Sequence, residues 1–465
     1  MAGAPGGRGP LVGQRHPARA PLVPLTVDSP EARRRPRGRA GREIVEAVLQ
    51  AASLSLARGG VEALTTNQLA RVAGVSVGSL YRYFPDKHAV VAELARSVER
   101  RGLELAASRV EALAGADGRA GTWELVGVLL DPALGTADTR RALLREVPRA
   151  WIQAATRETD AAVEELLASF IRSRREDFRA VDPARLAFVA FHAVEGVIEG
   201  ALLTGSASLA APWFREELFQ LAWRYAAPDG ALVESPTSAP TPPAPAPEGP
   251  TASILARLLE VPASRVDTEP RPPRSARGQR TADRVLAATS DLLAEGVYEA
   301  LSVRKIAARA GLSVGALYRY FPSREAVVAE LARGLKRRSR ALLEERLGGA
   351  RAAPFRDAIA ALVRIYVTPD LGDPTLRRAV IGQVPRRWTE ADTRETEARA
   401  VAGVAEAIRA RAGQVRDADP ERLAFFVSRA IESVAQATVM LHPAWIEDGL
   451  LLEECVDLAV RYLRA

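Results

Sequence analysis

The sequence predicts an all-α fold built from two tandem copies of one two-domain unit. Apolar residues recur at helical spacing in segments such as "REIVEAVLQAASLSLARGG" and "PARLAFVAFHAVEGVIEGALL", and no run alternates as a strand would. The stretch "AGVSVGSLYRYFPDKHAVVAELAR" returns as "AGLSVGALYRYFPSREAVVAELAR", with Tyr81 matched by Tyr318 at an offset of 237 residues (318 minus 81). This length indicates duplication of a whole protein, because solenoid repeats are only about 20 to 50 residues long.

Landmarks outside this stretch keep the same offset. Trp151 corresponds to Trp388, Tyr225 to Tyr462, and "TRET" at 156–159 to "TRET" at 393–396. Between the copies lie the Pro/Ala-rich segment "APDGALVESPTSAPTPPAPAPEGPTAS" and the basic stretch "RPPRSARGQR". Such compositions are typical of an extended linker, which would let the two copies lie side by side.

The composition is that of a globular protein. Hydrophobic residues make up 48% and charged residues 26% of the chain. No stretch approaches about 18 uninterrupted apolar residues, as a membrane helix needs, and the N-terminus "MAGAPGGRGPLVGQRHPARAP" lacks a signal-peptide pattern. The single cysteine, Cys455, excludes a disulfide framework and fits a reducing compartment. We therefore expect a cytoplasmic protein without a membrane partner.

The net charge of +7 is concentrated at the N-terminus. Residues 1–42 hold Asp28 and Glu31 against nine arginines, at positions 8, 15, 19, 33, 34, 35, 37, 39 and 42, so nine minus two gives +7 for this segment alone. A basic segment rich in Pro and Gly buries too little apolar surface to fold and suits contact with a polyanion. We predict a disordered basic arm over residues 1–41.

Helix-end signals define the first two helices of copy one. The first predicted helix stops at Gly59-Gly60. The second starts at Thr65, which forms a capping box with Gln68, and ends at Gly74.

The third and fourth helices follow at once. The third is the short "SVGSLYRYF", capped by Ser76 and stopped by Pro85. The longer fourth is capped by Asp86. Copy two repeats this order with the caps Ser302, Ser313 and Ser323.

Two of these capping serines, Ser76 and Ser313, also match the G-x-S-x-G pattern of serine hydrolases. That motif places its nucleophile between a strand and a helix, whereas the helix "QLARVA" precedes Ser76. A triad for Ser313 would also depend on His442, the only histidine that follows it. We therefore interpret Ser76 and Ser313 as helix caps and predict that the protein is not an enzyme.

Two short helices joined by a glycine-containing turn are typical of a helix-turn-helix, whose second helix lies in the major groove. Gly78 removes a side chain where that helix approaches the bases. Tyr81 and Tyr83 offer hydroxyl groups to phosphates. Lys87 begins the next helix, where the helix dipole also attracts phosphate.

The segments "LTTNQLARVAGVSVGSLYRYFPDKHAVVAEL" and "LSVRKIAARAGLSVGALYRYFPSREAVVAEL" closely resemble the DNA-binding domain of the TetR/AcrR family of bacterial transcriptional regulators. The resemblance implies an all-α repressor that binds a palindromic operator as a dimer. It also implies a small-molecule effector that enters the larger domain, moves the fourth helix and spreads the two heads. With that domain counted, it covers nearly everything except arm and linker.

The resemblance places particular residues against DNA. In copy one these are Thr66, Asn67, Val77, Gly78, Ser79, Tyr81, Tyr83 and Lys87. The matching positions in copy two are Val303, Arg304, Val314, Gly315, Ala316, Tyr318, Tyr320 and Arg324.

Domain boundaries follow from the repeat and the resemblance. After the arm, each copy has a helix-turn-helix DNA-binding domain and then a helical ligand/dimerisation domain. The predicted ranges are 42–87 and 88–226 for copy one, 227–278 for the linker, and 279–324 and 325–465 for copy two.

The fusion of two heads in one chain predicts an intramolecular pseudo-dimer. Its partners would be double-stranded operator DNA, an unidentified small-molecule effector and the other half of the same chain. A tether can supply an effective concentration in the millimolar range, on the order of 10⁻³ M. The alternative is a ligand-independent or activating DNA-binding protein of the same fold.

The two heads are not equivalent. Asn67 is replaced by Arg304 and Ser79 by Ala316, although 18 of 23 positions from 74 to 96 are identical in copy two. Arginine favours guanine and asparagine favours adenine, each by about 1–3 kcal/mol. We therefore predict an imperfect palindrome.

The larger domains show no catalytic, cofactor or metal signature, because their histidines lack ligand spacing. Trp151 and Trp388 either line a ligand cavity or fill the core, and the sequence does not decide between these. One predicted helix of each copy carries two polar residues that we expect at an interface between the copies rather than in a pocket. These are His192 and Glu195 in copy one and Arg429 and Glu432 in copy two.

Overall fold

The computed structural model describes residues 32, 36, 38–113, 115–204, 207–229, 267–295, 301–350, 353–367 and 374–465. Within these ranges every regular element is a helix, apart from one β-bridge between Val415 and Arg464. The predicted all-α fold in two tandem copies is confirmed. The predicted arm and linker lie largely outside the described residues.

The helices repeat in the same order in both copies. Copy one comprises α1 (Arg39–Ala63), α2 (Thr66–Ala73), α3 (Val77–Tyr83), α4 (Lys87–Ala112), α5 (Gly118–Gly135), α6 (Ala137–Glu146), α7 (Arg149–Ser173), η1 (Arg175–Asp177), α8 (Pro183–Thr204), η2 (Ala207–Ala210) and α9 (Pro212–Ala226). Copy two comprises α11 (Ala276–Glu295), α12 (Val303–Arg309), α13 (Val314–Tyr318), α14 (Arg324–Ala350), α15 (Phe355–Val367), α16 (Pro374–Gln383), η5 (Arg386–Thr389), α17 (Glu390–Arg409), α18 (Pro420–Leu441), α19 (Ala444–Glu447) and α20 (Leu450–Leu463).

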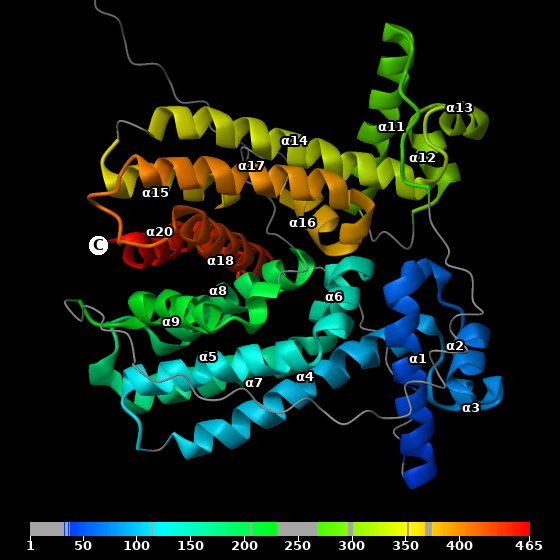
Figure 1. Ribbon diagram of the computed structural model, residues 1–465. Coiled ribbons are helices and arrows are strands. Elements are labelled where there is room, and N and C mark those ends of the chain that lie inside the picture. The colour runs from blue at the N-terminus through cyan, green and yellow to red at the C-terminus, as the bar shows by residue number, and fades with distance from the viewer. Residues whose placement is uncertain are drawn as a thin grey trace, which may run out of the picture.

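The larger domains of the two copies stack as layers (Figure 1). In the middle, α8 and α9 of copy one pack against α18 and α20 of copy two. Helices α4, α5 and α7 cover one outer side, and α14, α15 and α17 cover the other. The two heads, α1–α3 and α11–α13, project from the same side of this body.

The two copies share one hydrophobic core. Aromatic rings meet across the boundary, with 5.2 Å between the ring centres of Phe214 and Phe426 and 5.2 Å between those of Phe188 and Trp445. Each head has a smaller cluster of its own. The core therefore joins the bodies of the copies, while the heads are attached units with separate cores.

Small residues let α8 and α18 approach closely. A Cβ atom added to Gly196 would collide with the side chain of Ser433, and one added to Gly200 would collide with that of Arg429. Glycine is required at both positions by this contact, because the larger side chain comes from the opposite helix.

A buried polar network crosses the boundary twice. In its first half, the Arg179 guanidinium from copy one pairs with the Glu454 carboxylate from copy two, and both side chains are less than a tenth exposed. The Tyr225 hydroxyl donates to the same carboxylate at 2.6 Å. Burial and then the charge of Glu454 raise the pKa of Tyr225 well above its ordinary value, so its hydroxyl stays a donor.

The second half repeats these contacts with the copies exchanged. Arg416 from copy two pairs with Glu217 from copy one, which also accepts from the Tyr462 hydroxyl at 2.7 Å. Each residue is the counterpart of its predecessor at the 237-residue offset. This reciprocity is the pattern of a two-fold interface, in which residue i contacts j and j contacts i.

By length and composition alone, three helices could cross a membrane: Arg39–Val61 within α1, α8 and α18. In α8 and α18, 78% and 72% of the most apolar window is buried inside the protein, against 44% in α1. The contact between the two copies thus accounts for the apolar character of α8 and α18.

Replacing Glu454 with alanine is expected to lower the free energy of unfolding by about 3 kcal/mol, because Arg179 loses its buried carboxylate partner. The loss falls at the lower end of the known range because Asp457 remains 3.2 Å from Arg179. Urea unfolding of the full chain measures it. Glu453→Ala is the control, since Glu453 is the exposed neighbour on α20 and its loss should cost no more than about 0.5 kcal/mol. Equal losses would contradict this account of the network.

Candidate functional site

The predicted helix caps of head one are confirmed. The Thr65 hydroxyl accepts from the backbone N–H of Gln68 at 3.2 Å, and the Ser76 hydroxyl accepts from that of Ser79 at 3.1 Å. The turn between α2 and α3 depends on Gly74, whose φ of 72° lies in the left-handed region that favours glycine. These contacts fix the angle at which α3 leaves α2.

Head two is built in the same way. Ser302, Ser313 and Ser323 accept from backbone N–H groups three residues later at 3.3, 3.2 and 3.0 Å. Gly311 adopts a φ of 63° in the corresponding turn. Both serines of the G-x-S-x-G pattern are therefore caps between two helices, which is the wrong setting for a nucleophile elbow.

The recognition helices α3 and α13 leave unusual side chains exposed. Val77, Tyr81 and Tyr318 are 37%, 40% and 43% exposed, and no other large hydrophobic residues in the described part of the chain are as open. Gly78 and Gly315 are also exposed. Each helix thus presents an apolar and hydroxyl-bearing face with little side-chain bulk at its start, as a major-groove surface requires.

The helices that precede the recognition helices, α2 and α12, place further predicted DNA contacts beside this face. Asn67 on α2 and Arg304 on α12 are both exposed. The Thr66 hydroxyl lies 2.9 Å from the Tyr81 hydroxyl and orients it. Val303 takes the place of Thr66 in head two and has no hydroxyl, so Tyr318 lacks this support.

Four predicted phosphate contacts are instead turned into the heads. Tyr83 is only 6% exposed and its hydroxyl lies against Gly41, and Tyr320 is half-buried. The Lys87 ammonium donates to the Val61 carbonyl at 2.9 Å, and Arg324 donates to the Leu301 carbonyl at 2.9 Å. Lys87 thereby holds α4 to Val61 in α1, and Arg324 holds α14 to Leu301, which precedes α12. Their contact with DNA remains a prediction.

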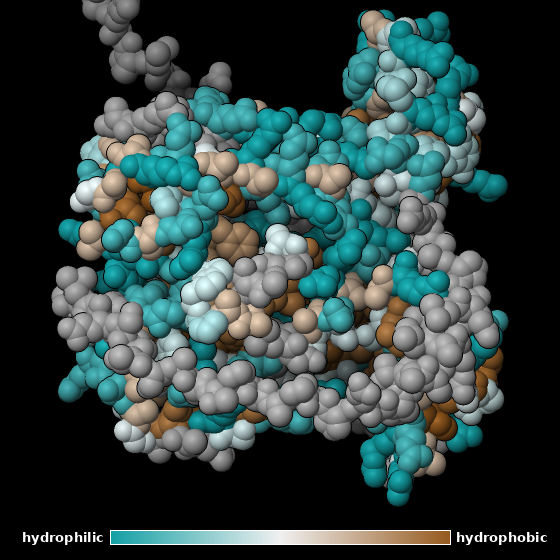
Figure 2. All heavy atoms as spheres, in the orientation of Figure 1, coloured by the Kyte–Doolittle hydropathy of each residue, from teal (hydrophilic) through white to brown (hydrophobic). Residues whose placement is uncertain are grey.

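The outer ends of the heads are strongly polar. Figure 2 shows hydrophilic side chains over the projecting parts of α11 and α1 and along α14. Arg277 and Arg280 lie near the start of α11, and Arg274 precedes it, all in the basic stretch noted in the sequence.

Neither tryptophan named as a possible ligand contact lines the cavity described below. Trp151 belongs to the core of head one, with its ring 4.6 Å from that of His88, and Trp388 belongs to the core of head two. They join each head to its larger domain, which is the core-filling alternative. Each tryptophan follows an arginine of the cavity wall by two residues, Arg149 or Arg386. Helical periodicity alone could not tell whether the tryptophan or the arginine faces the cavity.

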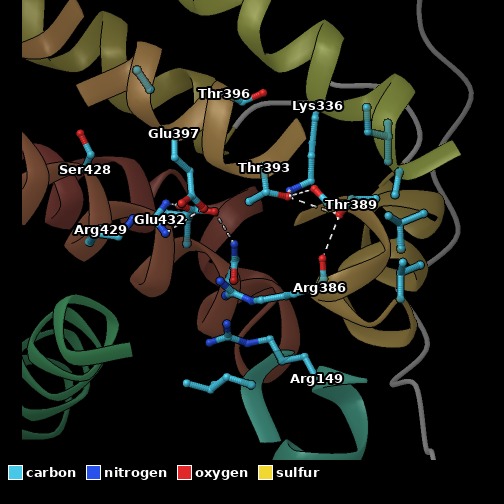
Figure 3. Close-up of a pocket in the computed structure, with 18 of the residues that line it drawn as sticks. Arg149, Lys336, Arg386, Thr389, Thr393, Thr396, Glu397, Ser428, Arg429 and Glu432 are labelled. Carbon is cyan, nitrogen blue, oxygen red and sulfur yellow. Dashed lines mark hydrogen bonds and ion pairs between the residues drawn. The ribbon is translucent and has the colours of Figure 1, made fainter. Parts of the chain in front are cut away.

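A cavity of about 250 Å³ lies where the two copies meet (Figure 3). Copy one contributes α6 and α7, through Leu144, Val147, Arg149 and Ile152. Copy two contributes α14, α16, η5, α17 and α18. The polar groups of copy two are Lys336, Arg340, Arg386, Thr389, Thr393, Thr396, Glu397, Ser428, Arg429, Glu432 and Gln436.

Cations outnumber anions in this cavity wall. Five lining residues are cationic and two are carboxylates. Burial, together with the charges of Arg386 and Arg429, lowers the pKa of Lys336 to about 8. Burial and then the charge of Arg386 lower the pKa of Arg149, although Glu199 lies 3.4 Å away and opposes this shift.

The four residues expected at the interface divide between two roles. His192 lies 3.2 Å from Glu164, and Glu195 pairs with Arg140, both within copy one. The stem of Arg429 packs against α8, as expected.

Arg429 and Glu432 also line the cavity between the copies, so an interface position and a pocket position are not exclusive here. Arg429 bridges Glu397 at 3.0 Å and Glu432 there.

The equivalent region of copy one is acidic. Glu99 stands where copy two has Lys336, and Asp160 stands where it has Glu397. Burial and then the charge of Glu99 raise the pKa of Asp160 to about 8. Burial raises the pKa of Glu195 to about 7, although Arg140 opposes the shift.

One set of ion pairs joins the copies on one side only. The Arg387 guanidinium lies 2.9 Å from Glu146 at the end of α6 and donates to the Gly59 carbonyl in α1 at 3.1 Å. Arg145 pairs with Glu390 at 2.6 Å. Copy one has Ala150 where copy two has Arg387, so the contact has no mirror image. It ties head one to the larger domain of copy two.

Sequence reasoning missed Arg149, Arg386 and Arg387. A signal for the first two existed, because "VPR" at 147–149 recurs at 384–386. Arg387 had none, since its counterpart in copy one is Ala150. Among the described residues, no group of three or more His, Cys, Asp or Glu could hold a metal ion.

Two family models match both copies of the chain. The model described as "Bacterial regulatory proteins, tetR family" matches residues 48–94 and 285–331. The model described as "Tetracyclin repressor-like, C-terminal domain" matches residues 124–225 and 354–463. Together the matches cover more than half of the chain.

Individual relatives are more distant. The HTH-type transcriptional repressor KstR of Rhodococcus jostii (strain RHA1) is 49% identical over 55 residues, 12% of this chain and 26% of that protein, so the match spans about a quarter of the relative. A TetR-family transcriptional regulator from Mesorhizobium loti MAFF303099 is 18% identical, with a TM-score of 0.33 over 41% of this chain and 100% of that one. The SmeT–triclosan complex is 19% identical, with a TM-score of 0.35 over 44% and 99%.

Ser76→Ala and Ser313→Ala are each expected to lower the free energy of unfolding of the affected head by about 1 kcal/mol, because a cap acceptor is lost. Ser76→Asp should retain most of it. Urea unfolding followed by circular dichroism measures the change. Equal stability of Ser76→Ala and the unaltered chain would contradict the cap assignment.

Raising the pH from 5 to 8 is expected to destabilise the fold through Asp160. Its pKa is about 8 in the folded chain and about 3.9 when unfolded. The unfolded state therefore binds fewer protons between these values, so stability falls as pH rises and levels off above about 8. Asp160→Asn should flatten this slope in urea titrations at each pH. The exposed Asp138→Asn is the control, and an unchanged slope in Asp160→Asn would refute the assignment.

Proposed function

The chain belongs to the TetR family of bacterial regulatory proteins, and we propose that it is a small-molecule-responsive repressor that binds one operator through both of its heads. The heads act as an intramolecular pseudo-dimer. The observation that carries this proposal is the placement of two capped recognition helices on the same side of one shared core (Figure 1). The protein would work in the cytoplasm, and no catalytic role is proposed.

The shared core supports the pseudo-dimer. The Arg179–Glu454–Tyr225 contacts and their exchanged counterparts bury charged groups between the copies. Such pairs are stable only while both partners are present. A second chain is therefore not needed to complete the interface, and assembly does not depend on protein concentration.

The cavity supports a ligand response. Its walls come from both copies, and η5 carries cavity residues directly beside Arg387, which contacts α1 of head one. A compound bound there would bear on the position of a head. It would act only through its preference between DNA-competent and incompetent states. A ligand-independent or activating regulator is the alternative, and it would show no release of DNA by any compound that binds the cavity.

The operator should be an imperfect palindrome. The exposed Asn67 of head one and Arg304 of head two have different base preferences, and Ser79 and Ala316 differ as well. Selection of bound DNA from a random pool, with the mass of the complex recorded, tests this. A single chain on one bipartite site is expected. Two chains on a perfect palindrome would overturn the pseudo-dimer, and failure to enrich any site would overturn the regulator itself.

Asn67→Arg is expected to make the selected half-sites more alike, shifting base preference by about 1–3 kcal/mol at one or two positions of one half-site. Arg304→Asn is the matched exchange and should make them alike in the other direction. Both are read from the same selection experiment. Unchanged half-sites in both variants would show that these positions do not read bases.

A further inference from the structure

The duplication has brought two equivalent arginines into one cavity. Arg149 and Arg386 correspond at the 237-residue offset, and both line the same wall. Figure 3 shows their guanidinium groups beside each other at the centre of the cavity. Like charges held together in a buried place are unfavourable unless a counter-charge lies between them.

The protein supplies only part of that counter-charge. Glu199 lies 3.4 Å from Arg149, and Glu397 and Glu432 are both engaged by Arg429. No hydrogen bond or ion pair joins the Arg386 guanidinium to another described side chain, whereas its backbone carbonyl accepts from Thr389. Arg340 has carboxylates of its own, Glu395 at 3.6 Å and Glu344 at 4.0 Å. The pair Arg149 and Arg386 is left with one carboxylate, Glu199, and so with an excess of one positive charge (two minus one).

The rest of the lining is apolar or carries hydroxyl groups. Val380, Val384, Val401 and Val439 face the same space, and the hydroxyls of Thr389 and Thr393 lie beside the Lys336 ammonium (Figure 3). A volume of about 250 Å³ lies below the about 300 Å³ at which pockets for drug-sized ligands begin. The occupant must therefore be small, with an apolar body and one anionic end.

Resting on the ligand-responsive function proposed above, we propose that this cavity binds one small amphipathic anion per chain, with its carboxylate or phosphate on Arg386 and Arg149. Guanidinium groups suit this role because their planar N–H donors match the oxygens of carboxylate and phosphate. The valines hold the apolar body.

Copy one does not offer a second such site. Glu99 replaces Lys336, and Phe191 and Ile152 replace Ser428 and Thr389. The counterpart therefore carries an added carboxylate and bulkier apolar groups where the cavity has cationic and hydroxyl groups. An anion entering it would meet the added carboxylate of Glu99, so binding is confined to the cavity that Arg149 and Arg386 share.

The anion also lies next to the one-sided contact with head one. Arg386 takes part in the cavity, and its neighbour Arg387 holds Glu146 and the Gly59 carbonyl. A shift of η5 toward a bound anion would move Arg387 and so change its contact with Glu146 and the Gly59 carbonyl. Head one, and not head two, is therefore the head whose position the anion governs.

Calorimetry on the full chain with 4-phenylbutyrate tests the site. The controls are 4-phenylbutanol and 4-phenylbutylamine, which have the same body with a neutral or cationic end, and 4-phenylbutyl phosphate separates phosphate from carboxylate. We expect one molecule per chain and at least tenfold tighter binding of an anionic probe than of either control. Comparable binding of all probes, or no binding by either anion, would overturn the proposal.

Substitutions locate the binding. Arg386→Gln should weaken the anion at least tenfold, and Arg386→Lys should restore part of the loss. Arg399→Ala removes an exposed arginine of α17 outside the cavity and should leave binding unchanged. Melting temperatures show whether each variant is folded. Full-strength binding by a folded Arg386→Gln would overturn the assignment, even if the anion binds elsewhere.

DNA release is measured separately, so that the two proposals can fail independently. The selected operator is titrated with the chain in the presence and absence of the better anionic probe. Binding at Arg386 without any change in DNA affinity would reject the ligand-responsive function and keep the site. Release of DNA without binding at Arg386 would do the reverse.

Discussion

The reciprocal burial of Glu454 and Glu217 between the copies is the interaction on which the rest of the structure depends. Each carboxylate pairs with an arginine. Each also accepts a hydrogen bond from a tyrosine hydroxyl, at 2.6 or 2.7 Å. Removing one member leaves another buried without its partner, at a cost of several kcal/mol, about 3–5 for a buried charge. The copies can therefore separate only with difficulty, and the positions of both heads are set by one body.

Duplication within one chain permits what a homodimer cannot. In a homodimer every substitution appears on both sides of the axis. In this chain, by contrast, Lys336 corresponds to Glu99 and Arg387 corresponds to Ala150. The interface residues of the Arg–Glu–Tyr networks have kept their symmetry, while the cavity and the contact to head one have lost it. The symmetric part maintains the assembly, and the asymmetric part is free to specialise.

Much of this architecture could be predicted from the sequence. The offset of 237 residues predicted both copies. The helix caps could be predicted because the Ser76 and Ser313 hydroxyls need only the backbone N–H groups three residues away. The cavity could not be predicted in that way. Whether Trp151 or Arg149 faces a cavity depends on how α7 of copy one meets α16 of copy two, and helical periodicity does not contain that contact. The inward turn of Tyr83 could not be predicted for a related reason, because it is set by the approach of α1 at Gly41.

The shared core also changes what the linker has to do. If the heads were joined only by a flexible tether, half-site spacing would vary with its length and conformation. Because α8, α9, α18 and α20 pack into one core, the spacing is instead fixed by how α4 and α14 leave that core. Under the proposed function, a ligand would change DNA affinity by displacing one head relative to this shared body. Under that proposal head one is the head displaced, since Arg387 contacts it and the counterpart of Arg387, Ala150, cannot form the same ion pair with head two.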